Sequence, residues 1–477
     1  MKRISVFAGA LLLVSAAAGA DASWIQRAID ACAARGGGCV TVPPGRYLVA
    51  SLEIRSNVEL RLERGAVLEG KVGMEHYRRL ELPYSEGAWM AVVQSVGTTN
   101  VALTGEGEVY GNGRAWPIPE GPRIGPSGKR ELDEGYRPRG IFFADAKNVR
   151  VEGVRLTEAA CWGLVFKRCE DVFVRNILVD SMANANSDGV DIEAKNFTMV
   201  DSEINSGDDA VVFKSNDPNF TMEHVFVSNV IARSHLNDFK IGTATHGTVR
   251  KLVVTDCRGE APRRHSVDRR WGRNAAWLGH ENFRGAKDLV TGGVSTAGIV
   301  ISCVDGGTVE DIVFRNLNLD ETCVPIFVRG DLRTGRLCGT PPSSSCVLRR
   351  ILLENITARA ESFCASSVTG CGPCRPTDVT FRNVRVVCKG GGRETAEAAT
   401  AAVPEGGGRY PDAALFADQA LPAYGLYLRH ADAITLDQTV FELAPQTTDS
   451  RPDVVAEDAQ VTRLGRKRRA AQSRGGI

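Results

Sequence analysis

The chain has little of what would point to a nucleic-acid-binding, membrane or helical-bundle protein. Its 58 lysines and arginines are matched by 57 aspartates and glutamates, so no net charge attracts it to nucleic acid or an anionic membrane. Aromatic residues make up 6% of the chain, whereas glycine occurs 50 times, which favours short strands and tight turns over helical bundles. Beyond the N-terminal apolar run, no stretch is long enough to span a bilayer. We expect neither nucleic acid nor a membrane as a partner.

Residues 1–20 have the pattern of a signal peptide. Met1-Lys2-Arg3 precedes the apolar run Val6–Ala18, and Ala18-Gly19-Ala20 is a small-residue cleavage site. A membrane anchor is the alternative, but this apolar run is short for spanning a bilayer. We therefore expect a secreted protein, or a periplasmic one in a bacterium.

Thirteen cysteines in an exported chain predict disulfides with one cysteine left over. Cys32 and Cys39 bracket a loop short enough for a disulfide to close. A second group contains a single CxxC and no histidine at a ligand spacing, so disulfides or buried thiols are favoured over zinc. We expect no metal and no cofactor. The second group is Cys364, Cys371, Cys374 and Cys388.

A short strand-like motif that ends in a polar turn recurs along the chain, and this repeat predicts the fold. Between Val149 and Val172 the interval is 23 residues, a solenoid period, whereas propeller blades repeat at about 40–50. Because no helical repeat intervenes, we predict an all-β, right-handed parallel β-helix solenoid rather than a propeller or sandwich. Asn at the turns fits, since it tolerates left-handed backbone and can bond its neighbours. The copies are 100–105, 148–154, 171–177, 223–230, 311–317, 350–356 and 378–384.

The remaining segments complete a single-domain organisation. Helical spacing over Trp24–Ala34, followed by three glycines, predicts a short N-terminal capping helix. The solenoid is expected to fill residues 21–464 as one domain, and the basic segment 465–477 to form a disordered tail. Insertions on a solenoid gather on one face and build the walls of a cleft. The insertions expected to do so lie at about 112–137, 258–295 and 389–423.

Two acidic clusters are the chemically informative part of the sequence. Asn186-Ser187-Asp188-Gly189-Val190-Asp191 is followed about twenty residues later by Gly207-Asp208-Asp209-Ala210. Either cluster alone is explained by turn chemistry, but crowded carboxylates cost stability unless they bind something or share protons. Val190 and Ile192 are expected to point inward, which leaves Asp191 and Glu193 outward and Asp188 at the mouth of the strand.

The solenoid places these two clusters on neighbouring coils. Because stacked strands lie about 4.8 Å apart, Asp188 should come close to Asp208 and Asp209 on one sheet. An inverting glycosidase needs one protonated carboxyl group as the acid and a carboxylate across a water, roughly 6.5–9.5 Å away. Charge crowding would keep one acid protonated near its working pH. The pattern therefore predicts glycosidic bond cleavage.

With these motifs the chain resembles glycoside hydrolase family 28, the polygalacturonases and rhamnogalacturonases, over roughly residues 24–455. Similarity to bacterial-type members extends to Phe239–Thr243, Pro325–Arg329 and Pro422–His430. The resemblance implies that Asp208 is the general acid and that Asp188 and Asp209 activate the water. It also implies a pectin-like, acidic polysaccharide as the partner, and we expect a monomer.

The chain departs from the family in its basic residues. Where polygalacturonases carry Gly-His-Gly, this chain has Leu236-Asn237-Asp238, and where they carry Arg-x-Lys for the substrate carboxylate, Gly298–Ser302 has no basic residue. Lys240, outward on its strand, is the best local substitute, although a solvated strand lysine is the structural alternative. The other substrate-binding candidates are Asn237 and Asp191, with Arg329, His235 and His246 weaker.

Three functions remain open at this point. The first is a secreted inverting glycosidase on a galacturonan, with the missing Arg-x-Lys favouring a branched or substituted polymer or exo action on oligomers. The second is a non-catalytic β-helix that binds polysaccharide. The third is a calcium-dependent, pectate-lyase-like enzyme. The acids could bind its Ca²⁺, but a lyase also needs a basic residue to abstract a proton. No arginine lies beside the acids in sequence, so the lyase ranks last.

Overall fold

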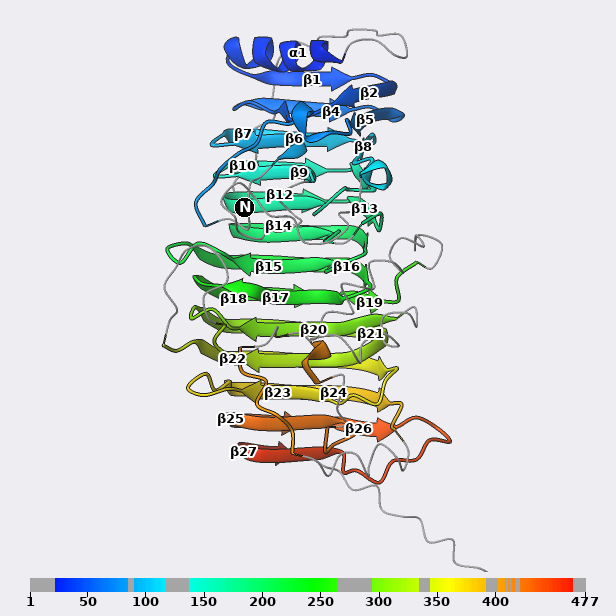
Figure 1. Cartoon of the computed structure of the whole chain (residues 1–477), viewed down its shortest axis with the longest axis vertical. Coiled ribbons are helices and arrows are strands. Elements are labelled where there is room, and N and C mark those ends of the chain that lie inside the picture. Colours follow the sequence, from blue (N-terminus) through cyan, green and yellow to red (C-terminus); the bar gives the residue numbers. More distant parts are fainter. Residues whose placement is uncertain are drawn as a thin grey trace, which may run out of the picture.

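Parallel strands stack into one long tower in the computed structural model (Figure 1). The only α-helix among the described residues is α1 (Ser23–Ala34), which lies across the first coil and buries Ile25, Ile29 and Cys32. The predicted helix over 24–34 is confirmed, beginning one residue earlier. The described residues are 22–84, 90–116, 137–184, 186–263, 294–333, 344–391, 402–408, 411, 413–416 and 421–465.

The strands form three faces. On each face, a strand pairs in parallel with the strand of the coil before it and with that of the coil after it. Each face carries its own set of short strands. The first face has β1 (Gly38–Val42), β4 (Val58–Leu62), β7 (Thr99–Gly105), β10 (Lys147–Glu152) and β18 (Thr248–Thr255). The second has β2 (Gly45–Val49), β5 (Ala66–Gly70), β8 (Glu108–Tyr110), β11 (Arg155–Thr157), β13 (Leu178–Ser181), β19 (Arg258–Glu260) and β26 (Val440–Leu443). The third has β3 (Leu52–Glu53), β6 (Ala91–Val96), β9 (Arg139–Ala144), β15 (Val211–Ser215), β17 (Asn237–Thr245), β20 (Ser295–Cys303) and β23 (Ser366–Gly370).

Longer strands turn the corners between faces. The clearest case is β14, which pairs with β15 at its start on the third face, then with β16 on the first and second faces. The long strands are β12 (Leu164–Arg175), β14 (Val190–Ser206), β16 (Thr221–Ser234), β21 (Thr308–Gly330), β22 (Val347–Ala360), β24 (Thr377–Cys388), β25 (Leu426–Asp437) and β27 (Val454–Leu464). The residues with described positions also contain three short 3-10 helices, η1 (Met74–His76), η2 (Gly113–Ala115) and η6 (Ala413–Phe416).

Side chains alternate between the interior and the faces, as the sequence predicts. Val190 and Ile192 belong to the continuous apolar core, while Asp191 and Glu193 lie on the third face. In register with Val190, the neighbouring strands place Leu164 and Val211 in the same core. This alternation confirms the all-β class and fixes which residues the third face presents.

Asparagine ladders hold the corners of successive coils together. Asn100 has φ 55° and donates from Nδ2 to Oδ1 of Asn57 at 2.8 Å, and Asn148 donates to Asn100 at 2.7 Å. A second ladder joins Asn383 to Asn355 at 2.8 Å and Asn355 to Asn316 at 3.0 Å. The repeated Asn in the sequence phrase is therefore explained by left-handed backbone and by amide bonds between coils.

Replacing one ladder residue should lower stability through its backbone conformation. At Asn355, φ is 52°, a region that costs an ordinary L-residue about 1–2 kcal/mol. We expect Asn355→Ala to reduce the free energy of unfolding by about that amount, measured by urea denaturation. Asn355→Gly, which tolerates this φ but loses the amide bonds, should lose less. An alanine variant as stable as the parent would show that the backbone conformation carries no cost.

The expected disulfide across the first loop is wrong. Cys32 and Cys39 are both free thiols, because Cys32 faces the core from α1 whereas Cys39 lies on the other side of β1, with Sγ 3.8 Å from Oγ1 of Thr41. In the second cysteine group, Cys371, Cys374 and Cys388 are free thiols as well.

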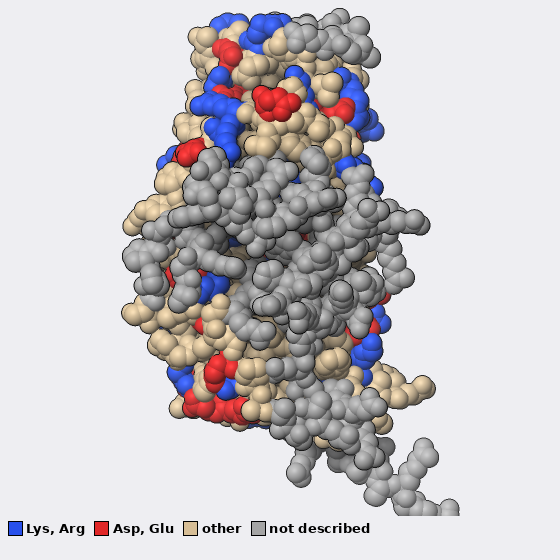
Figure 2. Space-filling view, in the orientation of Figure 1, with Lys and Arg blue, Asp and Glu red and all other residues tan. Residues whose placement is uncertain are grey.

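Several sequence expectations fall outside the described residues. These are the signal peptide over 1–20, the tail beyond residue 465, and most of the insertions, including residues 264–293. Over the part of the chain with described positions, no helix combines the length and apolar character that a membrane span needs. Figure 2 shows Lys and Arg interspersed with Asp and Glu on the described surface of this view, in keeping with the balanced charge of the chain.

Candidate active site

A row of polar and aromatic residues crosses five neighbouring coils at the entrance to the third face. In order they are Arg139, Trp162, Asp188, Asp209 and Asn237. Backbone amides next to these residues donate across the coils, for example from Gly189 to the carbonyl of Asp209 at 2.8 Å. The backbone therefore sets the order of the row, and it places Asp188 beside Asp209 although 21 residues separate them.

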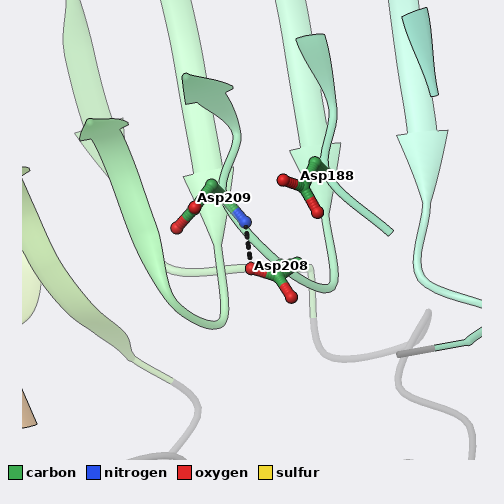
Figure 3. Close-up of side chains that lie close together, drawn as sticks. All are labelled: Asp188, Asp208 and Asp209. Carbon is green, nitrogen blue, oxygen red and sulfur yellow. Dashed lines mark hydrogen bonds between the residues drawn. The ribbon is translucent and has the colours of Figure 1, made fainter. Parts of the chain in front are cut away.

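Three carboxylates meet at this point (Figure 3). One oxygen from each of Asp188, Asp208 and Asp209 lies within 4.8 Å of the others. Asp208 lies in the turn before β15, where its Oδ1 accepts the backbone N–H of Asp209 at 2.9 Å and its carbonyl accepts hydroxyls from Ser206 and Ser234. Asp188 and Asp209 are each 3% exposed, and Asp208 is half-buried. The predicted meeting of the two acidic clusters is confirmed.

The carboxyl groups have different tendencies to hold a proton. Burial, reinforced by the negative charges of Asp188 and Asp209, raises the pKa of Asp208 well above the usual range for aspartate. Burial also raises the pKa of Asp188, to about 6, but Lys214 opposes the rise. A protonated Asp208 beside an ionised Asp188 is the acid and base pair that glycoside cleavage requires.

Two lysines neutralise the acids around Asp208. Nζ of Lys240 lies 2.9 Å from Oδ2 of Asp209, and Nζ of Lys214 lies 3.3 Å from Oδ2 of Asp188 and 2.8 Å from Oδ1 of Asp191. Among the described residues, Asp208 makes no ion pair. The charge distribution therefore singles out Asp208 from its three acidic neighbours.

Three predicted substrate-binding residues lie beside the acids. Asn237 donates from Nδ2 to Oδ1 of Asp209 at 2.5 Å, Asp191 pairs with Lys214, and Lys240 pairs with Asp209. Lys240 is only 1% exposed, so the alternative of a solvated strand lysine is wrong. Its ammonium group is bound to an acid of the site.

Two of the other candidates pair with acids outside the cluster, and the third, His235, lies on the coil after Asp208. Arg329 is on β21, three strands beyond β15 along the third face, and binds Asp331 through Nη2 at 2.7 Å. His246 faces Asp305, with Nε2 3.9 Å from Oδ2. His235 is buried, and burial lowers its pKa to about 4, which keeps the imidazole neutral at neutral pH. None of these contacts involves the three carboxylates.

Sequence reasoning missed Lys214, Trp162 and Arg139. Lys214 could have been found, because Val211 and Phe213 point into the core and the alternation puts Lys214 on the same side as Val212, facing out. Trp162 precedes β12, and Arg139 is the first residue of β9, so the alternation within the strands did not single them out. The guanidinium of Arg139 and the ammonium of Lys214 lie 5.1 Å and 3.4 Å from the centroid of the Trp162 ring.

Strand β20, which lies within the described part of the chain, carries no basic residue where the family pattern expects one. Strand β20 is the neighbour of β17, and Val300 stands in register with Lys240. Gly298, Val300 and Ser302 therefore occupy the outward positions of the coil after Lys240, with no cation among them. The departure from the family pattern is a real feature of this face.

A stack of parallel strands with clustered carboxyl groups on one outer face is an arrangement typical of the glycoside hydrolase class. The model of glycosyl hydrolases family 28 matches residues 32–231 and 294–405, well over half of the chain. The chain belongs to glycosyl hydrolases family 28, and the resemblance in its motifs is confirmed.

Named relatives agree with this placement. An exopolygalacturonase of Zea mays is 21% identical over 377 residues, covering 77% of this chain and 79% of that protein. Polygalacturonase QRT2 of Arabidopsis thaliana is 30% identical over 138 residues, which are 28% of this chain and 30% of that protein, so the chain spans under a third of this relative. The family 28 exopolygalacturonase of Yersinia enterocolitica has the same fold, with a TM-score of 0.62 at 17% identity over 92% of this chain and 75% of that one.

Proposed function

We propose that the protein is an exported glycoside hydrolase that cleaves a pectin-like galacturonan by an inverting, two-carboxylate mechanism. The observation that carries the proposal is the meeting of Asp188, Asp208 and Asp209 with their oxygens within 4.8 Å, in a chain of family 28. The raised pKa of Asp208 supplies a proton donor beside Asp188 and Asp209, which are both paired with lysines.

In this mechanism the roles follow from the protonation states. Asp208 donates its proton to the leaving glycosidic oxygen as the bond from the anomeric carbon breaks. Asp188 and Asp209 together take a proton from the water that attacks the same carbon. Oδ1 of Asp188 is buried and has no hydrogen-bond partner among the described residues, so it is available to accept from that water.

The stereochemical course needs its own experiment. The carboxylate oxygens lie closer together than the roughly 6.5–9.5 Å typical of inverting enzymes, and this spacing is the one observation that favours retention. Inversion is supported by the two candidate bases, Asp188 and Asp209, which would share one water without a covalent intermediate. Proton NMR of the first product should show an inverted anomer, whereas a retained anomer would make one of these aspartates a nucleophile.

The substrate is proposed to differ from plain polygalacturonic acid. The outward positions of β20 have no basic residue, and both lysines beside the acids are engaged by aspartates. A branched or substituted galacturonan, or exo action on oligomers, fits this distribution of charge. The relatives named as exopolygalacturonases are in keeping with exo action.

Three further properties belong to the same proposal. The stack is a right-handed parallel β-helix solenoid, because parallel crossover connections are right-handed in about 98% of cases. The protein is secreted or periplasmic, on the pattern of residues 1–20. It acts as a monomer.

The test is the release of reducing ends from a panel of pectic polymers, with and without a chelator. We expect hydrolysis that resists chelation, because Lys214 and Lys240 already compensate the acids. Absorbance from an unsaturated product that vanishes with chelator would show a calcium-dependent lyase instead. Binding without turnover on every polymer would show a polysaccharide-binding module.

A further inference from the structure

The structure distributes cations unequally over the acid cluster. Lys240 binds Asp209, and Lys214 binds both Asp188 and Asp191, whereas Asp208 makes no ion pair among the described residues. We infer that Lys214 is a positioning residue that keeps Asp188 ionised as the water-activating base while Asp208 keeps its proton. This role rests on the hydrolase activity proposed above, and it deepens that proposal.

Lys214 is held from three sides. Its Nζ lies 2.8 Å from Oδ1 of Asp191, 3.3 Å from Oδ2 of Asp188, and 3.4 Å from the centroid of the Trp162 ring. The side chain is 12% exposed, so water screens these charges little. An ammonium group over an aromatic face is attracted to the ring. The three partners fix the ammonium group between the two carboxylates.

The backbone makes this arrangement rigid. Asp191 and Lys214 stand on the neighbouring strands β14 and β15, which pair from Val190 with Val211 to Ile192 with Phe213. Asp188 is fixed at the mouth of β14, where the amide of Gly163 donates to its carbonyl at 2.7 Å. Trp162 precedes that glycine on the previous coil. The position of Lys214 therefore depends on side chains from three successive coils.

The cation also has a defined electrostatic effect. An opposite charge within about 4–6 Å favours the ionised form of a carboxyl group. Lys214 is the nearest cation that lowers the pKa of Asp188, against burial, which raises that pKa to about 6. Within the described parts of the chain, the other charged groups around Asp188 are Asp191 near the start of β14, Asp208 and Asp209 before β15, Lys240 on β17, and Arg137 and Arg139 at the start of β9.

Two substitutions should move the pH dependence in opposite directions. Lys214→Met removes the cation, so the carboxylate loses its stabilising partner and the acidic limb of kcat/KM should move up by about 1 pH unit or more. Asp191→Asn removes the anion that competes for Lys214, so the ammonium group interacts with Asp188 alone. The acidic limb of kcat/KM should therefore move to lower pH. Lys214→Arg, which keeps the positive charge, should hold the limb within a few tenths of a pH unit of the parent.

The pKa can also be followed without activity. In protein labelled with 13C at the aspartate side-chain carbonyl carbon, the signal lost in Asp188→Asn identifies Asp188, and its titration should shift as the kinetics do. If the parent hydrolyses no pectic polymer, the hydrolase proposal fails while this titration still decides the role of Lys214. Should Lys214→Met not fold, the Asp191→Asn and Lys214→Arg titrations carry the test.

The outcome that overturns the inference is specific. A purely structural lysine would lower the melting temperature of Lys214→Met and leave both the acidic limb and the titration of Asp188 unchanged. An unchanged acidic limb in Asp191→Asn would also contradict the inference, because an ammonium group that acts on Asp188 must lower its pKa further once the competing anion is gone.

Discussion

Asp208→Asn is expected to lose nearly all hydrolysis, with a fall in kcat of about 10²–10⁴-fold, the usual contribution of a general acid. The amide has no proton of the required acidity to give to the leaving oxygen. It is also close in shape to the carboxyl group, and its oxygen can still accept the backbone N–H of Asp209 that binds Oδ1 at 2.9 Å. The fold and the binding of polysaccharide should therefore remain.

The experiment compares reducing-end release, thermal unfolding and polysaccharide retention in affinity electrophoresis. A matched control is Asp320→Asn, which changes a half-exposed aspartate paired with Arg359 on the surface. We expect this control to keep full activity. Near-normal turnover in Asp208→Asn would show that another group protonates the leaving oxygen and that the assigned role is wrong.

Asp209→Asn is expected to lower both kcat and stability. Asp209 is a proposed base, so the rate should fall by about 10²–10⁴-fold. It is also the partner of buried Lys240, at 2.9 Å, and of Asn237. Removing one member of a buried ion pair leaves an uncompensated charge, which typically costs about 3–5 kcal/mol.

A double variant separates these two effects. In Asp209→Asn/Lys240→Met the buried cation is gone, so the free energy of unfolding should recover most of its loss, measured by urea denaturation. The rate should not recover, because the carboxylate is still missing. A double variant that regained activity would mean that Asp209 serves only to compensate Lys240, and that Asp188 alone activates the water.

The cluster of three carboxylates could be predicted from the sequence because it depends on short-range patterns. Val190 and Ile192 alternate with Asp191 and Glu193, and the repeat interval places Asp208 and Asp209 one coil further on. Both relations are local or periodic, and coil stacking at about 4.8 Å turns them into distances. The inference that the two acidic clusters meet needed no knowledge of side-chain contacts.

The partners of the acids could not be predicted in the same way. The sequence indicated that Lys240 faces outward, and an outward lysine is expected to contact solvent or substrate. In the structure the lysine is instead buried against Asp209. Burial depends on what covers a face, which periodicity does not encode. The disulfide expected between Cys32 and Cys39 failed for a related reason, because closeness along the chain did not bring the two thiols to the same side of β1.

By itself, the sequence determined the all-β class, the repeating coil, the asparagine corners and the meeting of Asp188 with Asp208 and Asp209. These follow from backbone preferences and from a periodicity that each segment carries within itself. Only the tertiary structure decided which cation serves which acid, that Lys214 lies between Asp188 and Asp191 over Trp162, and that Asp208 is left without an ion pair among the described residues. Those contacts join side chains from three coils, and their energies depend on burial and exact spacing, which exist only once the coils have stacked.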